Sequence, residues 1–220
     1  MSCSIRLPYR AIGTAALAAL LILHPAAAEN RIRLFNGEDL RGWEQKEFKG
    51  RTQYSLVRTD GRAALKADSR ASASGLVREI EIDLTKTPYL HWSWRVDNTL
   101  GDNDETRKSG DDYPARVYVV VSGGVLFWRT RAVNYVWSSN QPVGNSWPNA
   151  YTGNARMIAV RSGDNERGQW REERRNVRED LRGLFGADIT HIHAVAVMTD
   201  TDDTGGAATA YYGELYFSAQ

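Results

Sequence analysis

Short runs in which apolar and polar side chains alternate recur along most of the chain and leave little room for helix. They cover residues 52–57, 63–67, 75–84, 89–96, 116–121, 125–129, 133–137, 156–161, 192–198 and 211–217. β-Branched and aromatic residues are frequent in these runs, and Gly, Asp, Asn or Pro bounds most of them. A period of two residues is typical of strands with one buried face. The pattern predicts an all-β fold, an antiparallel jelly-roll β-sandwich with one short helix.

Two local signals refine this prediction. Gly123 and Gly124 separate two alternating runs, and a two-glycine turn favours a tight hairpin because glycine adopts positive φ without steric cost. The helix is expected to begin after Asn176 as N-cap, with Glu179 at the third helical position, and to end at Gly186. Its apolar residues lie on one face, so we expect it to cover one open end of the sandwich.

The first 28 residues have the pattern of a secretory signal peptide. Two arginines precede an apolar stretch at 11–23, and small residues follow at 26–28, which predicts cleavage after residue 28 and an exported protein, periplasmic or secreted. Residues 29–220 are then expected to form a single β-sandwich domain, without a membrane span, because no run reaches the ~20 apolar residues required. The only cysteine, Cys3, lies in the predicted signal, so disulfides are not expected.

The charge balance argues against nucleic acid as a partner. The full chain has a formal charge of +1, and residues 29–220 have −1, because the segment before them holds two arginines and no acidic residue. Proteins that bind nucleic acids usually carry a basic surplus on one face. The partner we expect is therefore a polar small molecule or a glycan, and the oligomeric state stays open.

Two acidic segments, residues 102–112 and 200–205, each lie beside a run that is predicted to be a strand. If strands 116–121 and 192–198 are antiparallel neighbours, both segments lie at the same edge of the sheet. Carboxylates that meet there can surround a hard cation, since Ca²⁺ takes six to eight oxygen ligands from flexible loops. The candidate metal ligands are Asp111, Asp112, Asp200, Asp202 and Asp203.

The calcium signal is incomplete, and a plainer interpretation remains open. The second segment places Asp200, Asp202, Thr204 and a glycine with the spacing of an EF-hand loop, but Tyr211 stands where a bidentate Glu is needed. The alternative is a polar turn whose aspartates accept hydrogen bonds from backbone N–H groups, with Asp111 or Asp112 paired to an arginine.

Aromatic residues provide the candidate ligand contacts. Tyr135 lies in a predicted strand, and the loop after it, 138–153, carries Trp147 and Tyr151 among asparagines. Such a mixture can stack on sugar faces and hydrogen-bond to hydroxyl groups. With Arg116 beside the first acidic segment, the predicted ligand-binding residues are Trp147, Tyr151, Arg116 and Tyr135.

Several motifs in a fixed order resemble those of a known family. They are WSWRV at 92–96, DDYPARVYVV at 111–120, YVW at 135–137, RNV at 175–177, FG at 185–186, MTDTDDT at 198–204 and AYYGE at 210–214. Together they resemble the bacterial exported family catalogued as domain of unknown function 3047, a resemblance that implies no activity and transfers no catalytic residue. The Trp-x-Trp strand and the final Tyr-x-Gly-x-Leu-x-Phe strand are also similar to galactose-binding-type jelly rolls.

The leading hypothesis is an exported, non-catalytic domain that binds a carbohydrate or a similar polar ligand of the cell envelope, with Ca²⁺ as the candidate cofactor. One alternative is a hydrolase of polysaccharides that uses carboxylates such as Asp111 and Asp202. Another is a structural or partner-binding envelope protein. No Gly-x-Ser-x-Gly motif and no cysteine after residue 28 are present, so covalent acyl chemistry has no support, and the catalytic residues stay unassigned.

Overall fold

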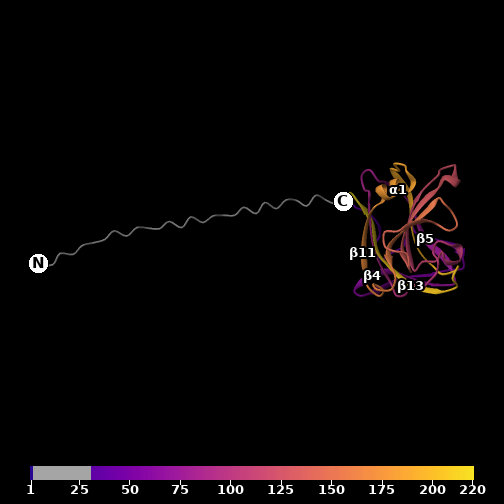
Figure 1. Ribbon diagram of the computed structural model, residues 1–220. Helices are drawn as coiled ribbons and strands as arrows, with labels where there is room; N and C mark the ends of the chain where they lie inside the picture. Colours follow the sequence, from indigo (N-terminus) through magenta and orange to yellow (C-terminus); the bar gives the residue numbers. More distant parts are fainter. Residues whose placement is uncertain (2–30) are drawn as a thin grey trace.

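The alternating runs fold into strands that pair in two sheets, and the computed structural model describes Met1 and residues 31–220 (Figure 1). The six-stranded sheet follows the order β11 (Arg171–Asn176), β6 (Tyr89–Val96), β13 (Ala207–Ser218), β4 (Arg62–Arg70) and β3 (Gln53–Thr59), with β1 (Ile32–Phe35) also paired to β13. The predicted signal segment, its cleavage site and Cys3 lie outside the described residues.

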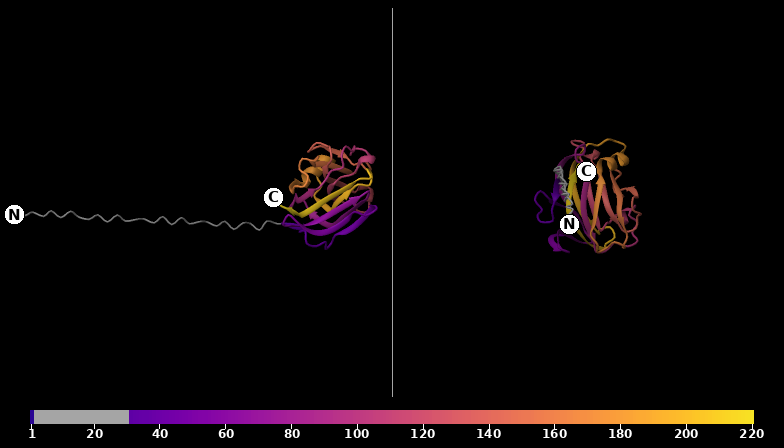
Figure 2. Two further views of the ribbon diagram at one scale, coloured as in Figure 1. Left: turned by 90° about the horizontal axis from the view of Figure 1, so that it is seen from below. Right: turned by 90° about the vertical axis from the view of Figure 1, so that its left-hand side faces the viewer.

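The seven-stranded sheet follows the order β2 (Glu44–Lys49), β5 (Ala73–Asp83), β12 (His191–Asp200), β7 (Ala115–Val121), β8 (Arg131–Ser138), β10 (Ala155–Ser162) and β9 (Ser146–Pro148). Its pairings are antiparallel except that β10 runs parallel to β8. The two sheets lie face to face (Figure 2). The expected antiparallel jelly-roll β-sandwich with one short helix is therefore confirmed. No helix in the part of the chain that the structure describes is long and apolar enough to cross a membrane.

Of two turns that contain glycine, one forms a tight hairpin and the other does not. Asp60 and Gly61 join β3 to β4 with φ values of 52° and 73°, a turn in which both residues are left-handed, as a tight hairpin requires. The hairpin predicted at Gly123 and Gly124 is wrong, because residues 125–129 form no strand. Instead, the N–H of Leu126 donates to the carbonyl of Gly123, and a 3-10 turn, η2 (Phe127–Arg129), precedes β8. The antiparallel neighbour of β7 is β8, which begins at Arg131 and not at the run 125–129 that the turn was expected to pair with it.

Helix α1 (Val177–Phe185) has the predicted ends. The Asn176 side chain accepts a hydrogen bond from the N–H of Glu179, and Gly186 ends the helix with φ 64°. Val177 and Leu181 are buried in the core between the sheets. The helix lies at one end of the sandwich (Figure 1), so the expectation that it covers this end is confirmed.

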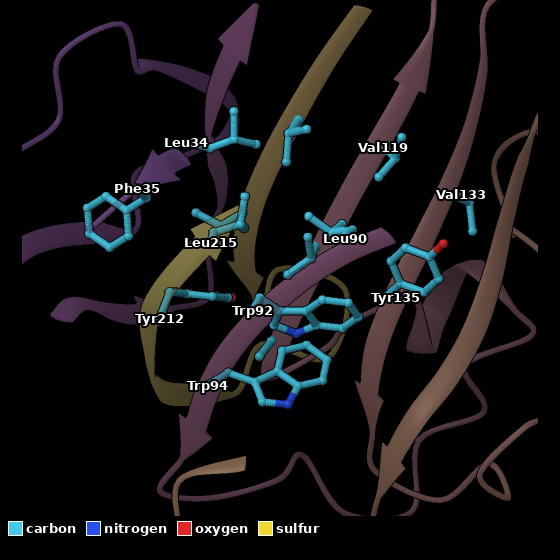
Figure 3. Packing of buried hydrophobic residues seen from close by; sticks show 14 of the residues in the cluster. Leu34, Phe35, Leu90, Trp92, Trp94, Val119, Val133, Tyr135, Tyr212 and Leu215 are labelled. Carbon is cyan, nitrogen blue, oxygen red and sulfur yellow. The ribbon is translucent and has the colours of Figure 1, made fainter. Parts of the chain in front are cut away.

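The core between the sheets is rich in aromatic rings. Trp92 and Trp94 point inward from β6 and meet at a centroid distance of 5.4 Å, edge to face. Tyr135 points inward from β8 and stacks on Trp92 at 5.2 Å, as Figure 3 shows. Because side chains alternate along a strand, the residues next to Tyr135 in sequence face the opposite side of the sheet. That outer face carries the candidate site.

Candidate functional site

The candidate site is an open cavity of about 510 Å³ on the outer face of the seven-stranded sheet, which we call the outer cavity. Its floor comes from β12, β7 and β8, where Tyr118 lies in register between Ala196 and Asn134. Met198 and Arg116, which are also paired in register, line it beside Tyr118. The volume is in the range of ~300–1,000 Å³ that is usual for small-molecule sites.

The two acidic segments meet at the wall of the outer cavity. Strands β12 and β7 are antiparallel, so the end of one and the start of the other lie at the same edge. The carboxylate of Asp112 accepts hydrogen bonds from the N–H groups of Asp203, at 3.2 Å, and Thr204, at 2.6 Å. These bonds fix the second segment against the first. They differ from the alternative interpretation, in which the aspartates of the turn itself accept such bonds and Asp111 or Asp112 pairs with an arginine.

A buried ion pair joins the segments from below. Arg116 and Asp200 are only 4% and 1% exposed, and Nε of Arg116 donates to Oδ1 of Asp200 at 2.7 Å. A second contact links Nη2 to the other carboxylate oxygen, and Nη2 also donates to the carbonyl of Asp111. Arg116 was predicted from the sequence to be a ligand contact. In the structure its guanidinium is paired with Asp200 and forms the base of the cavity wall.

Asp111 lies in the wall with its carboxylate held by neutral donors. Oδ2 accepts a hydrogen bond from the amide of Asn149 at 2.7 Å, and Oδ1 accepts one from the hydroxyl of Tyr113 at 3.2 Å. Burial raises the pKa of Asp111 above its ordinary value, and the nearby charge of Arg116 opposes this rise. The carboxylate is therefore desolvated without an ion-pair partner among the described residues.

Asp112, Asp202 and Asp203 form what we call the carboxylate corner, in which one oxygen of each lies within 4.8 Å of the others. Burial raises the pKa of Asp202, and the charges of Asp203 and Asp112 raise it further. Two neighbours already contact the corner: Nζ of Lys49 lies 3.7 Å from Asp202, and the hydroxyl of Tyr151 donates to Asp203 at 2.7 Å. Of the five predicted metal ligands, only these three come together, because Asp200 is paired with Arg116 and Asp111 is held by Asn149.

Glu105 anchors the first acidic segment to the end of β8. Its side chain is fully buried and accepts hydrogen bonds from Oγ of Ser138, at 2.5 Å, and from the N–H of Ser139, at 2.6 Å. Burial raises the pKa of Glu105 to about 7, although these hydrogen bonds favour the ionised form. This carboxylate therefore has a structural position below the loop and does not line the outer cavity.

Two of the predicted ligand contacts do not lie at the cavity surface. Trp147 is 5% exposed, because β9 pairs with β10 and turns the indole under the loop, where its N–H donates to the carbonyl of Glu105. Tyr135 is fully buried on the inner face of the sheet, and its hydroxyl donates to Asp180. The structure thus places both in the interior, which does not agree with the sequence-based expectation. Tyr151, 54% exposed, does line the cavity.

Phe48 and Asn134 are among the lining residues that sequence reasoning missed. Phe48 is 72% exposed at the end of edge strand β2, which no alternating pattern marked. Asn134 is 1% exposed, and its Oδ1 has no hydrogen-bond partner among the described residues. The available signal was a polar residue between Val133 and Tyr135, both of which face the core. Leaving a buried polar atom without a partner costs ~1–3 kcal/mol, and this oxygen is itself buried rather than open to the cavity.

A family model described as "Protein of unknown function (DUF3047)" matches residues 41–216. No curated protein matches the chain in sequence.

Solved structures with a similar arrangement of strands include a family 30 carbohydrate-binding module of a cellulosomal cellulase of Clostridium thermocellum, with 9% identity, TM-score 0.49, and coverage of 86% of this chain and 98% of that one. Another is the xyloglucanase domain of NopAA from Sinorhizobium fredii in complex with cellobiose, with 12% identity, TM-score 0.48, and coverage of 87% and 98%. A lectin from Bauhinia forficata in complex with GalNAc has 12% identity, TM-score 0.41, and coverage of 87% and 98%. With TM-scores below 0.5, these likenesses say nothing about what this chain binds.

Proposed function

We propose that this chain, which belongs to the DUF3047 family, binds a carbohydrate or a similar polar ligand in the outer cavity. The family description assigns no activity, so the proposal depends on the site itself. The observation that carries it is the lining of the outer cavity, which the exposed ring of Tyr151 shares with the carboxylates of Asp111 and Asp203.

The rest of the lining suits a ligand with both hydroxyl groups and apolar faces. Tyr151 and Phe48 expose aromatic rings at the rim, and such rings pack against the C–H faces of sugars. Carboxylates of Asp111 and Asp203 offer strong acceptors for hydroxyl donors. An aromatic rim with a few convergent polar groups is what small-molecule sites usually present.

A Ca²⁺ ion is a second occupant that we propose to test at the carboxylate corner. Asp112, Asp202 and Asp203 would hold it, and oxygens of the ligand or of water would have to complete the six to eight that Ca²⁺ takes. Both oxygens of Asp112 already accept backbone hydrogen bonds, so the protein's own ligand set is short. Calorimetric titration of EDTA-treated protein with Ca²⁺ tests this, and no heat with no thermal shift would remove the metal from the proposal.

The binding proposal is tested with a glycan screen followed by calorimetry on the best ligand. Tyr151→Ala should weaken binding by roughly tenfold or more, since it removes a rim ring. Tyr211→Ala is the matched control, because its hydroxyl also donates to a surface aspartate, Asp97, but it lies in the other sheet. Equal effects of both substitutions, or a screen without any ligand, would refute the proposal.

Hydrolysis of a polysaccharide is the second candidate function. It is favoured by one observation: burial raises the pKa of both Asp111 and Asp202, two carboxylates that line the same cavity. A carboxyl group with a raised pKa can serve as a general acid. Product formation from envelope polysaccharides that disappears in Asp111→Asn and Asp202→Asn, with the unfolding midpoint kept, would support it. Stability changes alone, without any ligand or turnover, would instead support a structural or partner-binding protein.

We also propose that the protein is exported to the periplasm or outside the cell, because residues 1–28 carry the signal pattern. Mass spectrometry of the protein from its native host should give the mass of residues 29–220, and an intact residue 1–28 segment would refute cleavage.

A further inference from the structure

We infer that the ligand of the outer cavity is a neutral saccharide with an acetamido group, whose acetyl end lies on the cavity floor. This inference rests on the proposed function and names the ligand class for the same site. It starts from Asn134, a residue of β8 that is 1% exposed and lines the cavity. Its neighbours Val133 and Tyr135 face the core, so the amide of Asn134 points to the outer side of the sheet.

The Asn134 amide offers the cavity a hydrogen-bond donor. Neither atom of this amide has a hydrogen-bond partner among the described residues, but only Oδ1 is fully buried. The nitrogen Nδ2 is therefore the polar atom of the side chain that a ligand can reach. Because an amide nitrogen donates and does not accept, the ligand atom that meets it must be an acceptor.

The side chains around this donor are mostly apolar. Asn134 is in register with Tyr118 on β7 and with Met157 on β10. The hydroxyl of Tyr118 donates to Sδ of Met198 at 3.5 Å, and Ala155 also lines the cavity. A ligand hydroxyl needs an acceptor as well as a donor, whereas a carbonyl oxygen needs only the donor that Nδ2 supplies. The floor therefore suits a carbonyl that carries a small apolar group, as an acetyl group does.

The charges of the lining disfavour an anionic acceptor. The lining carries a formal charge of −2, from Asp111, Asp200, Asp202 and Asp203 against Arg116 and Lys49. Both cations are engaged, because Arg116 is paired with Asp200 and Nζ of Lys49 contacts Asp202. A carboxylate, sulfate or phosphate of the ligand would be repelled by this charge. The acceptor that meets Nδ2 is therefore a neutral carbonyl.

The cavity wall can bind the N–H of the same acetamide. Asp111 and Asp203 line the cavity without an ion pair among the described residues, and an ionised carboxylate accepts hydrogen bonds without donating. An acetamide has one acceptor, one donor and a methyl group, and the cavity presents a donor, acceptors and an apolar floor. An O-acetyl ester lacks the N–H, and a free amine lacks the carbonyl, so neither matches all three features.

The test compares three tetrasaccharides with the same β-1,4 linkage by calorimetry, built from N-acetylglucosamine, glucose or glucosamine. The first differs from the second only in the acetamido group that replaces a hydroxyl, so the difference in affinity reports that group. We expect the N-acetylated form to bind roughly tenfold or more tightly than the glucose form, because a hydrogen bond and the burial of a methyl group both contribute.

Asn134→Leu removes the donor while the volume of the side chain stays similar. It should reduce the preference for the N-acetylated form to roughly fourfold or less, the share that burial of the methyl group supplies alone. Asn165→Leu, at an exposed asparagine outside the cavity, is the matched control and should leave the preference unchanged. The unfolding midpoint of each variant is measured alongside, and Asn134→Ala, which also removes the amide, repeats the test if the leucine variant does not fold.

The outcomes separate this inference from the proposed function. Equal binding of the N-acetylated and glucose forms, tightest binding of the glucosamine form, or an unchanged preference in Asn134→Leu would overturn the inference and leave the proposed function standing. If none of the three tetrasaccharides binds, a glycan screen decides. Hits confined to glycans without an acetamido group overturn the inference, and hits on acetamido sugars that are lost in Asn134→Leu support it. A screen without any ligand would overturn the inference and the proposed function together.

Discussion

Replacing Arg116 with methionine tests how the two acidic segments are held together. The substitution removes the guanidinium but keeps an apolar stem of similar length, and it leaves the carboxylate of Asp200 buried at 1% exposure without its cation. Breaking a buried pair on one side costs about 3–5 kcal/mol, because the remaining charge stays desolvated and unpaired. In a domain of this size, each kcal/mol lowers the unfolding midpoint by ~2–4 °C, so a decrease of ~6–20 °C is expected.

The double variant Arg116→Met/Asp200→Asn separates the pair from the rest of the fold. Without the carboxylate, no charge is stranded, and the asparagine oxygen can still accept the N–H of Tyr113, which now donates to Asp200 at 3.3 Å. The double variant should therefore be more stable than Arg116→Met alone by about 2 kcal/mol. Chemical unfolding followed by tryptophan fluorescence gives these free energies, and the four proteins complete a double-mutant cycle.

An exposed ion pair in the first acidic segment provides the control. Arg107 pairs with Asp104 at 3.0 Å, but its side chain is 78% exposed, so Arg107→Met should leave the unfolding midpoint nearly unchanged. The reasoning is refuted if Arg116→Met behaves like this control. It is also refuted if the two single substitutions add to the double within about 0.5 kcal/mol, because the side chains would then be energetically independent.

Three further predictions concern stability. Because burial raises the pKa of Glu105 to about 7 in the folded chain, the stabilisation from its bound proton is complete below about pH 4 and is lost as the pH rises through 7. The wild-type protein should lose up to about 3 kcal/mol of unfolding free energy across this window. In pH-dependent unfolding, Glu105→Gln should flatten the profile, and a slope identical to that of the wild type would be the contrary result. Trp147→Ala should lower the free energy of unfolding by about 3–5 kcal/mol because it leaves a void under the loop, whereas Tyr151→Ala should change it by less than about 1 kcal/mol. Similar losses for both variants in urea unfolding would show that the two rings are placed wrongly. Asn176→Ala should cost about 1 kcal/mol by removing the N-cap of α1, measured in the same way, and an unchanged free energy of unfolding would mean that the cap adds nothing.

The helix and most central strands were predictable because their signals are local. The cap at Asn176, the stop at Gly186 and the alternation in β6, β8 and β12 each depend only on residues that are close together in the sequence. The edge strands β2 and β11 were not predicted. Their sequences, EQKEFK and REERRN, carry almost no apolar residues, because an edge strand can hydrogen-bond through its backbone while its side chains stay in water.

The candidate site was also predictable only in part. From sequence, the two acidic segments could be expected at one edge, since this follows from strand order alone, and the structure brings them together there. The sequence could not tell which of five aspartates gather, because that depends on Arg116 pairing with Asp200 and on Asn149 reaching Asp111. These partners are 84 and 38 positions apart in the chain.

The direction in which each aromatic ring points was decided only by the tertiary structure. Tyr135 alternates correctly with its neighbours, but alternation alone does not say which side of the sheet is covered by the other sheet. Trp147 is drawn under the loop by the pairing of β9 with β10, which no local pattern marks. The sequence by itself determined the class of fold, the helix and the two acidic segments, because local patterns encode them. Only the tertiary structure determined which side chains face the outer cavity, because facing depends on how distant strands pair and on which face the second sheet buries.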